Sequence, residues 1–254
     1  MNVYELSAAL DERIPLSLRE EWDNDGLMVA PDGNKEIKKA LVALDATTPA
    51  LEYAAKAGAD AVVTHHPLVF GPLFSLRGDD AVGKRAVFCI RHGIAVLSYH
   101  TRLDSLSGGV NDCLAEALGL KNTSAFLPFG RLGETAREYS FEEFRTVCEK
   151  ALGEPAFACV KRRGAIKKAA VVSGGGKHFV RDAYLAGADV YVTGEADHAA
   201  LIEAAEYGIS MLCLTHHATE RTVLPALARI VREAADNKVE TEVFDFDRAA
   251  EYGV

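Results

Sequence analysis

Short apolar runs alternate with helical stretches along the chain, and this pattern predicts an α/β protein. The run ALVAL at 40–44 has the length and the branched residues of a buried strand, and so does AAVVS at 169–173. A helical stretch follows each run and ends at Gly58 or Gly187, where glycine suits the left-handed residue after a helix. A second apolar run then follows, ADAVVT or ADVYVT. Each strand-helix-strand unit should therefore have parallel strands joined by a right-handed connection.

These two units form an internal repeat. Residues 37–66 align without a gap on residues 166–195, and 12 of the 30 aligned positions are identical. After a slip of one residue the similarity continues, because residues 93–104 align on residues 208–220. We therefore expect two similar three-layer α/β lobes related by a pseudo-two-fold axis.

No Pro/Gly/Ser-rich linker divides the chain, so the two lobes, at 1–125 and 126–254, should form one compact unit. A helix at 5–14 should open the first lobe. Ser140 and Glu143 form an S-x-x-E capping box, which predicts the start of the helix that opens the second lobe. The last two predicted elements are a helix and a strand, at 220–237 and 239–247.

Composition excludes several classes of function. The 254 residues are 49% hydrophobic, yet no apolar run approaches the roughly 20 residues that span a membrane. The formal net charge of −9 argues against binding to nucleic acid or to an anionic membrane, since both attract clustered Lys and Arg. The five cysteines form no C-x-x-C pair, and the N-terminus lacks the apolar segment of a signal peptide. We therefore expect a cytoplasmic protein that binds neither a membrane nor nucleic acid.

Three clusters of histidine and carboxylate side chains follow predicted strands. They are His65 with His66, His100 with Asp104, and His216 with Glu220. Ligands of open α/β sheets bind beyond the carboxyl ends of the strands, so these clusters should converge on one metal site.

The residue types favour transition metals. Neutral imidazole with carboxylate suits Zn²⁺, Mn²⁺, Fe²⁺ or Ni²⁺, whereas Ca²⁺ and Mg²⁺ prefer oxygen ligands. Pro67 disfavours a helical backbone at His66, so the adjacent His65 and His66 could address two different metals. Asp104 or Glu220 could bridge two ions with its two oxygens. The residues therefore predict a dinuclear centre rather than a mononuclear one.

The triplet Thr-His-His occurs at 64–66 and again at 215–217, but the two copies are not equivalent. The repeat aligns the first triplet with Thr193-Gly194-Glu195, and it aligns His100 with His216. His217 is therefore expected to lie outside the ligand set.

Two further features allow more than one interpretation. The segment 173–177, Ser-Gly-Gly-Gly-Lys, lies between a strand and a helix, where it could hold a phosphate or simply form a tight turn. The role of Gly174-Gly175-Gly176 therefore stays open. Glu195 and His198 could hydrogen-bond to a metal ligand, or they could be partly exposed turn residues.

Motifs along nearly the whole chain carry a family resemblance. They are WDNDGL at 22–27, THHPLVFGPL at 64–73, YHTRLDSLSGGVNDCLAEALGL at 99–120, GRLGE at 130–134, VTGE at 192–195 and HHATER at 216–221. In this order they resemble the NGG-interacting-factor-like dinuclear metal-centre family, whose members are often labelled GTP cyclohydrolase 1 type 2 homologues. The resemblance implies a toroidal homohexamer with two divalent metal ions per subunit, held between two lobes.

The resemblance also implies a ligand set. The implied metal ligands are His65, His66, Asp104, His216 and Glu220. His100 is implied to lie close by, where it could hydrogen-bond to a ligand. The chain resembles the short form of the family, without the domain that longer relatives insert. Arg102 departs from the pattern, because many relatives carry Asn at this position.

Two functions from different classes follow. The first is a metal-dependent hydrolase of a nucleotide or phosphorylated small molecule, with GTP ring opening implied by the family label. Water activated by the metals would then attack, so no side chain is assigned as the catalytic group. The second is a non-catalytic oligomer that handles metal ions or acts as a regulatory scaffold. An accessible metal site would favour the enzyme, and a fully enclosed ligand set would favour the scaffold.

Overall fold

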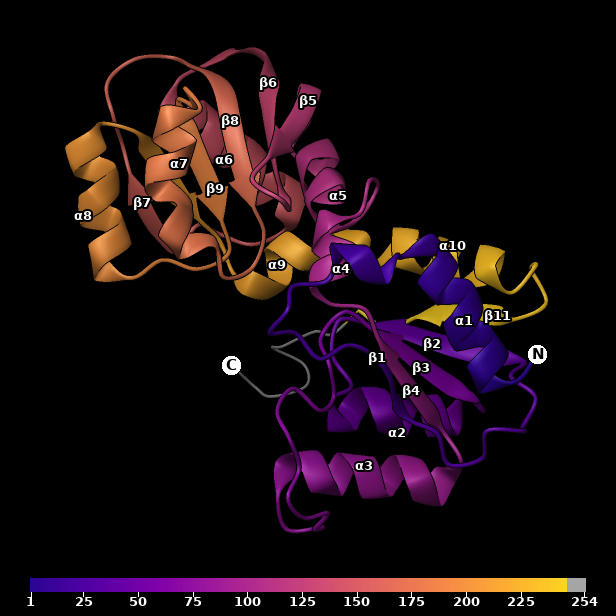
Figure 1. Ribbon diagram of the computed structural model, residues 1–254. Coiled ribbons are helices and arrows are strands. Elements are labelled where there is room, and N and C mark those ends of the chain that lie inside the picture. Colours follow the sequence, from indigo (N-terminus) through magenta and orange to yellow (C-terminus); the bar gives the residue numbers. More distant parts are fainter. Residues whose placement is uncertain (246–254) are drawn as a thin grey trace. The chain divides into compact units, whose positions relative to one another are not determined.

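The computed structural model describes residues 1–245, and within them the chain forms two compact α/β units. The first unit contains Met1–Leu103 together with the chain from Leu224 onward, and the second contains Asp104–Val223. Each unit has its own sheet with helices packed on it (Figure 1). The predicted α/β class with two lobes is therefore confirmed.

The first sheet has five strands in the order β1-β4-β3-β2-β11. Their bounds are Gly26–Val29 for β1, Lys39–Ala43 for β2, Ala61–Thr64 for β3, Ala95–Ser98 for β4 and Glu240–Val243 for β11. Strands β2, β3 and β4 are parallel neighbours, β11 joins β2 in parallel, and β1 runs antiparallel to β4. All four residues of β3 and of β4 are buried, as expected for central strands covered on both faces.

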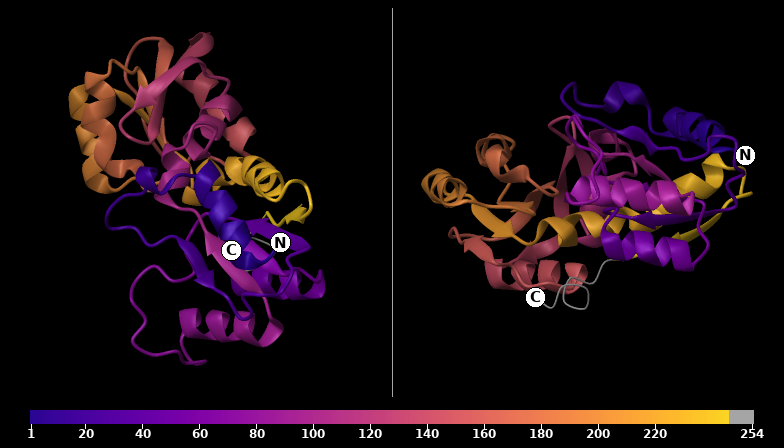
Figure 2. Two further views of the ribbon diagram at one scale, coloured as in Figure 1. Left: turned by 45° about the vertical axis from the view of Figure 1, so that its right-hand side comes forward. Right: turned by 90° about the horizontal axis from the view of Figure 1, so that it is seen from below.

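Helices cover both faces of the first sheet. They are α1 (Val3–Arg13), α2 (Thr48–Lys56), α3 (Ala81–His92) and α10 (Leu224–Ala234), with a short 3₁₀ turn at Leu16–Leu18. Helices α2 and α3 lie together on one face, and α1 and α10 lie on the other (Figure 1). The N-terminal helix and the last helix, indigo and yellow in Figure 2, pack against each other although they stand at opposite ends of the sequence.

The second sheet has six strands in the order β5-β6-β8-β9-β10-β7. Their bounds are Lys121–Phe126, Gly130–Tyr139, Ala158–Val160, Ile166–Val172, Val190–Thr193 and Ser210–Cys213 for β5 to β10 in turn. Along β8 the side chains alternate between two apolar clusters, with Val171 in one and Val172 in the other. The sheet is therefore buried on both faces, which is the three-layer arrangement predicted for a lobe.

Helices of the second unit supply the other halves of these two clusters. Its helices are α5 (Val110–Ala117), α6 (Phe141–Leu152), α7 (Val180–Leu185), α8 (His198–Tyr207) and α9 (His216–Glu220), with 3₁₀ turns at Gly176–Phe179 and Arg221–Val223. A further short helix, α4 (Thr101–Ser105), spans the boundary between the units. Ser140 caps α6, and its reciprocal hydrogen bonds with Glu143 confirm the predicted capping box.

The structure extends the internal repeat beyond the aligned residues. Strands β2-β3-β4 of the first unit and β8-β9-β10 of the second are both parallel triplets, as the alignment predicts. Each triplet also carries an antiparallel edge strand on its last member, β1 on β4 and β7 on β10. Gly58 and Gly187 both have positive φ angles, 69° and 75°, which confirms that they follow the helices in the left-handed conformation.

The extents of the two units differ from the predicted ranges 1–125 and 126–254. The helix predicted at 220–237 and the strand predicted at 239–247 correspond to α10 and β11. Strand β11 pairs with β2, so both elements belong to the first unit and not to the second. Residues 104–125 fall in the second unit. The physical reason is that without β11 the strand β2 would be an edge strand with unpaired backbone N–H and C=O groups. Strand β11 forms hydrogen bonds with these groups. The part of the predicted last strand beyond residue 245 lies outside the described residues, and the predicted pseudo-two-fold relation stays a prediction.

Within residues 1–245 the longest helices fall well short of a membrane crossing, and none combines the length with the apolar character that a crossing needs.

The place of α10 in the first unit can be tested by a core truncation. Leu227→Ala should lower the free energy of unfolding by about 2–5 kcal/mol, because the side chain is fully buried and its loss leaves a cavity. Arg229→Ala, on the exposed side of the same helix, should change it by less than about 0.5 kcal/mol. Urea unfolding followed by circular dichroism measures both. Equal stability of the two variants would contradict the packing of α10.

Candidate metal centre

Three histidines gather at the carboxyl ends of two neighbouring strands in the first unit. His65 and His66 directly follow β3, and His100 lies two residues after β4. Because β3 and β4 are parallel and adjacent, their ends place these side chains together. The ring centroids are 4.7–5.7 Å apart, and one nitrogen atom from each ring lies within 4.8 Å of the others, so the group could hold a metal ion.

Each of these three rings uses its Nδ1 atom in a hydrogen bond. His65 Nδ1 donates to the carbonyl oxygen of Tyr99 at 3.0 Å, and a carbonyl can only accept, so Nδ1 carries the proton. His66 Nδ1 pairs with Asp45 Oδ1 at 3.0 Å, and His100 Nδ1 pairs with Asp23 Oδ1 at 2.8 Å. These acceptors fix the tautomer that leaves the lone pair on Nε2, which is the arrangement of metal-binding histidines.

Asp23 is the most strongly held of the acceptors. Its buried carboxylate also accepts from the backbone N–H of Thr101 at 3.0 Å and from the Thr101 hydroxyl at 2.7 Å. Burial raises the pKa of Asp23, but the hydrogen bonds from His100 and Thr101 outweigh it and hold the pKa well below its usual value. Asp23 is therefore an ionised acceptor that fixes the His100 ring.

A second group of donors forms in the second unit, around α9. His216 begins this helix just after β10, and Glu220 ends it, so the two side chains are four residues apart on one face. His216 Nε2 lies 3.0 Å from Glu220 Oε1, and His216 Nδ1 lies 2.8 Å from Glu195 Oε1. The predicted meeting of His216 and Glu220 is observed, and Glu195 takes the place at His216 that Asp23 takes at His100.

The glycine-rich segment lies directly against this second group. A Cβ atom at Gly174 would stand 2.2 Å from Glu220 Oε1 and 2.9 Å from His216 Nε2, so any side chain there would displace these two groups. Gly174 also has a φ of 56°, and its backbone N–H donates to the Thr219 hydroxyl at 3.0 Å. The glycine therefore keeps open the space in front of the two donor atoms.

The remaining predicted residues lie as follows. Asp104 is half-buried in α4, and its backbone carbonyl accepts a hydrogen bond from the Asn111 side chain at 3.5 Å. His217 lies 3.7 Å from Glu154, so it has a local ion-pair contact. His198 is exposed at the first residue of α8. Glu195 and His198 were both considered as hydrogen-bond partners of a predicted metal ligand, and Glu195 contacts the predicted ligand His216 directly.

Comparison with known proteins identifies the family of this chain. A family model described as Duf34/NIF3 (NGG1p interacting factor 3) matches residues 1–250. The chain belongs to the DUF34/NIF3 family. A Clostridium perfringens relative named GTP cyclohydrolase 1 type 2 homolog is 32% identical over 249 residues, which cover 94% of this chain and 95% of that protein. A Methanocaldococcus jannaschii relative of the same name is 34% identical and covers 87% of this chain and 90% of its own length.

Two solved structures share the fold of this chain. A Bacillus cereus protein related to NIF3 aligns with a TM-score of 0.89 at 21% identity, over 97% of each chain. Reduced HcgD from Methanocaldococcus jannaschii aligns with a TM-score of 0.81 at 30% identity, over 97% of this chain and 98% of that chain. The fold predicted from the family motifs is therefore confirmed.

Three acceptors that orient the histidines of this NIF3 protein were not singled out as such in the sequence. Asp45 lies two residues beyond β2, so the rule that sites form at strand ends could have found it. Asp23 is part of the WDNDGL motif, but it stands 77 residues before His100, and no local pattern joins the two. The Tyr99 carbonyl is a backbone group and leaves no signal in the residue types.

The Asp23 contact makes a testable difference to acid stability. Because the pKa of Asp23 is depressed in the folded state, its contribution is present above the unfolded pKa of about 3.9 and is lost as the pH falls below that value. Asp23→Asn should lower the unfolding free energy at pH 7 by about 1–3 kcal/mol. Below about pH 4 the loss of stability should be shallower in the variant than in the wild type, by up to about 1.4 kcal/mol per pH unit.

Chemical unfolding at a series of pH values between 3 and 7 measures this difference. Asp32→Asn, at an exposed position of the same unit, is the control for the substitution itself and should change the unfolding free energy at pH 7 by less than about 0.5 kcal/mol. Parallel profiles for Asp23→Asn and the wild type would contradict an ionised Asp23.

Proposed function

We propose that this NIF3 protein binds two divalent metal ions through His65, His66, Asp104, His216 and Glu220. The observation that carries the proposal is the fixed tautomer of its histidines. In His65, His66 and His100 alike, Nδ1 is engaged by an oxygen acceptor, which leaves Nε2 as the nitrogen that can bind a metal ion. One such ring is common in protein cores, but three of them together at neighbouring strand ends point to metal binding, and His216 adds a ring that faces the carboxylates of Glu195 and Glu220.

The donor set fits a borderline transition metal. Imidazole nitrogen together with carboxylate oxygen suits Zn²⁺, Mn²⁺, Fe²⁺ or Ni²⁺, and none of the proposed ligands is a thiolate. Gly174 supports the fit, because a side chain there would fill the space beside His216 and Glu220. His100 offers a further nitrogen next to His65 and His66, so it is a candidate ligand as well as a neighbour.

We propose that the metal centre serves hydrolysis of a nucleotide or another phosphorylated small molecule. Bound divalent ions would supply Lewis-acid activation of water and of a substrate oxygen. The chain's own residues orient the donors: Asp23, Asp45 and Glu195 hold the rings of His100, His66 and His216 in place. Their negative charge also makes each imidazole a better donor toward a cation.

The names of the relatives support a substrate class for the proposed activity. Proteins named GTP cyclohydrolase 1 type 2 homolog match most of this chain, and this supports a GTP-like substrate for the proposed activity. Assembly into a homohexamer and location in the cytoplasm, which the resemblance and the composition imply, belong to the same proposal.

Metal content tests the ligand assignment. His216→Ala and Glu220→Ala should each remove roughly half or more of the metal bound per chain, because each removes a donor from the proposed centre. His198→Ala should keep the wild-type content, since this exposed histidine lies in the same unit but outside the ligand set. Mass spectrometry of the metals in the purified protein measures all three. Unchanged content in His216→Ala would sink the assignment.

Turnover tests the enzyme. Protein reconstituted with Zn²⁺, Mn²⁺, Fe²⁺ or Ni²⁺ should hydrolyse at least one member of a panel of nucleotides and phosphoesters. Asp104→Ala should lower that rate by on the order of 100-fold, because it removes a carboxylate that is proposed to bind the metal ions. Glu116→Ala, an exposed carboxylate on α5, is the matched control. Full metal loading without turnover on the whole panel would instead favour the non-catalytic scaffold.

A further inference from the structure

Two large aromatic side chains stand exposed beside His100. Trp22 is 63% exposed and Phe70 is 55% exposed, although both are apolar rings of the kind that folding normally buries. Both rings meet His100 edge to face, with centroid distances of 6.2 Å for Trp22 and 6.0 Å for Phe70. The two rings also contact each other, at 6.1 Å and an angle of 53°. They form a small apolar wall next to the three-histidine cluster.

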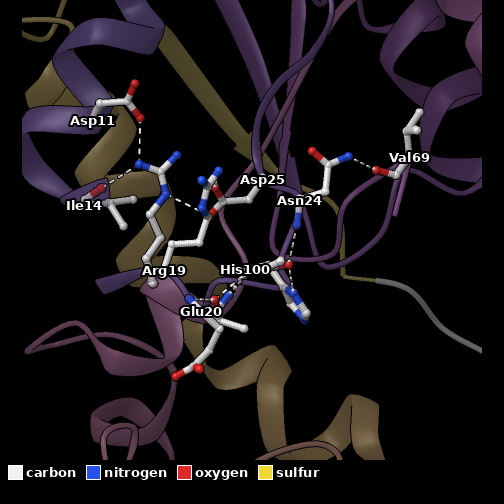
Figure 3. Close-up of polar contacts among 11 residues, drawn as sticks. Asp11, Ile14, Arg19, Glu20, Asn24, Asp25, Val69 and His100 are labelled. Carbon is white, nitrogen blue, oxygen red and sulfur yellow. Dashed lines mark hydrogen bonds and ion pairs between the residues drawn. The ribbon is translucent and has the colours of Figure 1, made fainter. Parts of the chain in front are cut away.

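The wall is built from two segments that hydrogen bonds hold together. The Asn24 side-chain N–H donates to the carbonyl oxygen of Val69 at 2.6 Å and so ties the segment of Trp22 to the segment of Phe70 (Figure 3). Asp23, between Trp22 and Asn24, is anchored in turn to His100. The two exposed rings are therefore positioned by the fold and are not loose surface residues.

The geometry of the wall favours a flat ligand. Two rings inclined at 53° cannot enclose a third ring as a parallel sandwich, but one of them can stack on it while the other meets its edge. Stacking on aromatic side chains recognises any flat heteroaromatic ring, because every such ring has a π face. His100 joins the wall to the nitrogen donors of His65 and His66, so a ligand held there by its oxygens would have apolar surface within reach for a ring.

We propose that Trp22 and Phe70 form a stacking platform for a planar heteroaromatic ring of the purine type, carried by the substrate of the metal centre. This inference rests on the proposed function, which concerns the polar part of the substrate. It adds that the substrate carries a flat ring, which Trp22 and Phe70 bind. It makes Trp22 and Phe70 specificity-determining residues.

Trp22 provides its own probe, because it is the only tryptophan in the chain. The Zn²⁺-loaded full chain is titrated with guanosine 5′-monophosphate and with ribose 5-phosphate, two compounds that differ only by the base. Tryptophan emission should change saturably with the nucleotide and stay constant with the sugar phosphate. N-acetyltryptophanamide titrated in parallel corrects for light absorbed by the base.

Substitutions at the wall supply the second readout. Phe70→Ala should weaken nucleotide binding by at least about five-fold, the loss expected from one stacking contact. Phe70→Tyr should retain it, because the ring is kept. Phe74→Ala is the matched control, since Phe74 lies in the same loop and is 99% exposed. Isothermal titration calorimetry on the four proteins measures the affinities, and circular dichroism and metal content confirm that each is folded and loaded.

Several outcomes would overturn the platform: no binding of the nucleotide, equal binding of the nucleotide and the sugar phosphate, or equal affinities of Phe70→Ala and Phe74→Ala. Binding is measured without turnover, so the platform and the hydrolase fail separately. Base-dependent binding with no turnover on any substrate leaves the platform standing and sinks the hydrolase. If the protein turns over a substrate and Phe70→Ala changes neither KM nor kcat, the hydrolase stands and the platform fails.

Discussion

The parallel pairing of neighbouring strands is the constraint on which the candidate centre depends. Parallel strands bring their carboxyl ends to one edge of the sheet, so residues that are far apart in sequence meet there. In the first unit, β3 and β4 place His66 and His100 together in this way. In the second unit, β8, β9 and β10 do the same for Gly174, Glu195 and His216. The helices mainly bury these sheets, and the candidate metal donors of the first unit directly follow its strands.

A second layer of buried charge supports the edge of the first unit. Arg102 is almost fully buried and donates to Asp25 at 2.8 Å, to Asp11 at 2.7 Å and to the Ile14 carbonyl at 2.9 Å. Its guanidinium also lies 4.5 Å from the centre of the Tyr99 ring. Burial raises the pKa of Asp25, and Arg102 offsets only part of that cost. Such a network adds little net stability but permits few arrangements, which suits a segment that must place Asp23 and Trp22.

Sequence reasoning succeeded where the information is local and failed where it is not. The parallel triplets, the glycines after the helices and the capping box of Ser140 all follow from residues a few positions apart, and the structure contains them. The pairing of β11 with β2 joins residues about 200 positions apart, and the sequence of a short strand does not say which sheet edge it will complete. The Asp23 contact to His100 escaped for the same reason: its geometry belongs to the fold and not to any spacing.

The repeat explains why the two Thr-His-His triplets differ. After β3 the first unit places two histidines, whereas the equivalent positions after β9 hold Gly194 and Glu195. Gly194 cannot be enlarged, because a Cβ atom there would lie 2.6 Å from the Thr219 hydroxyl and 2.8 Å from the Cα of His216. In the second unit, Gly194 lets α9 pack against this strand end, Glu195 orients His216, and the candidate metal donors lie on α9 itself. The two copies of the repeat therefore differ at this strand end. The end of β3 carries the histidines His65 and His66, whereas the end of β9 carries Glu195, which orients His216.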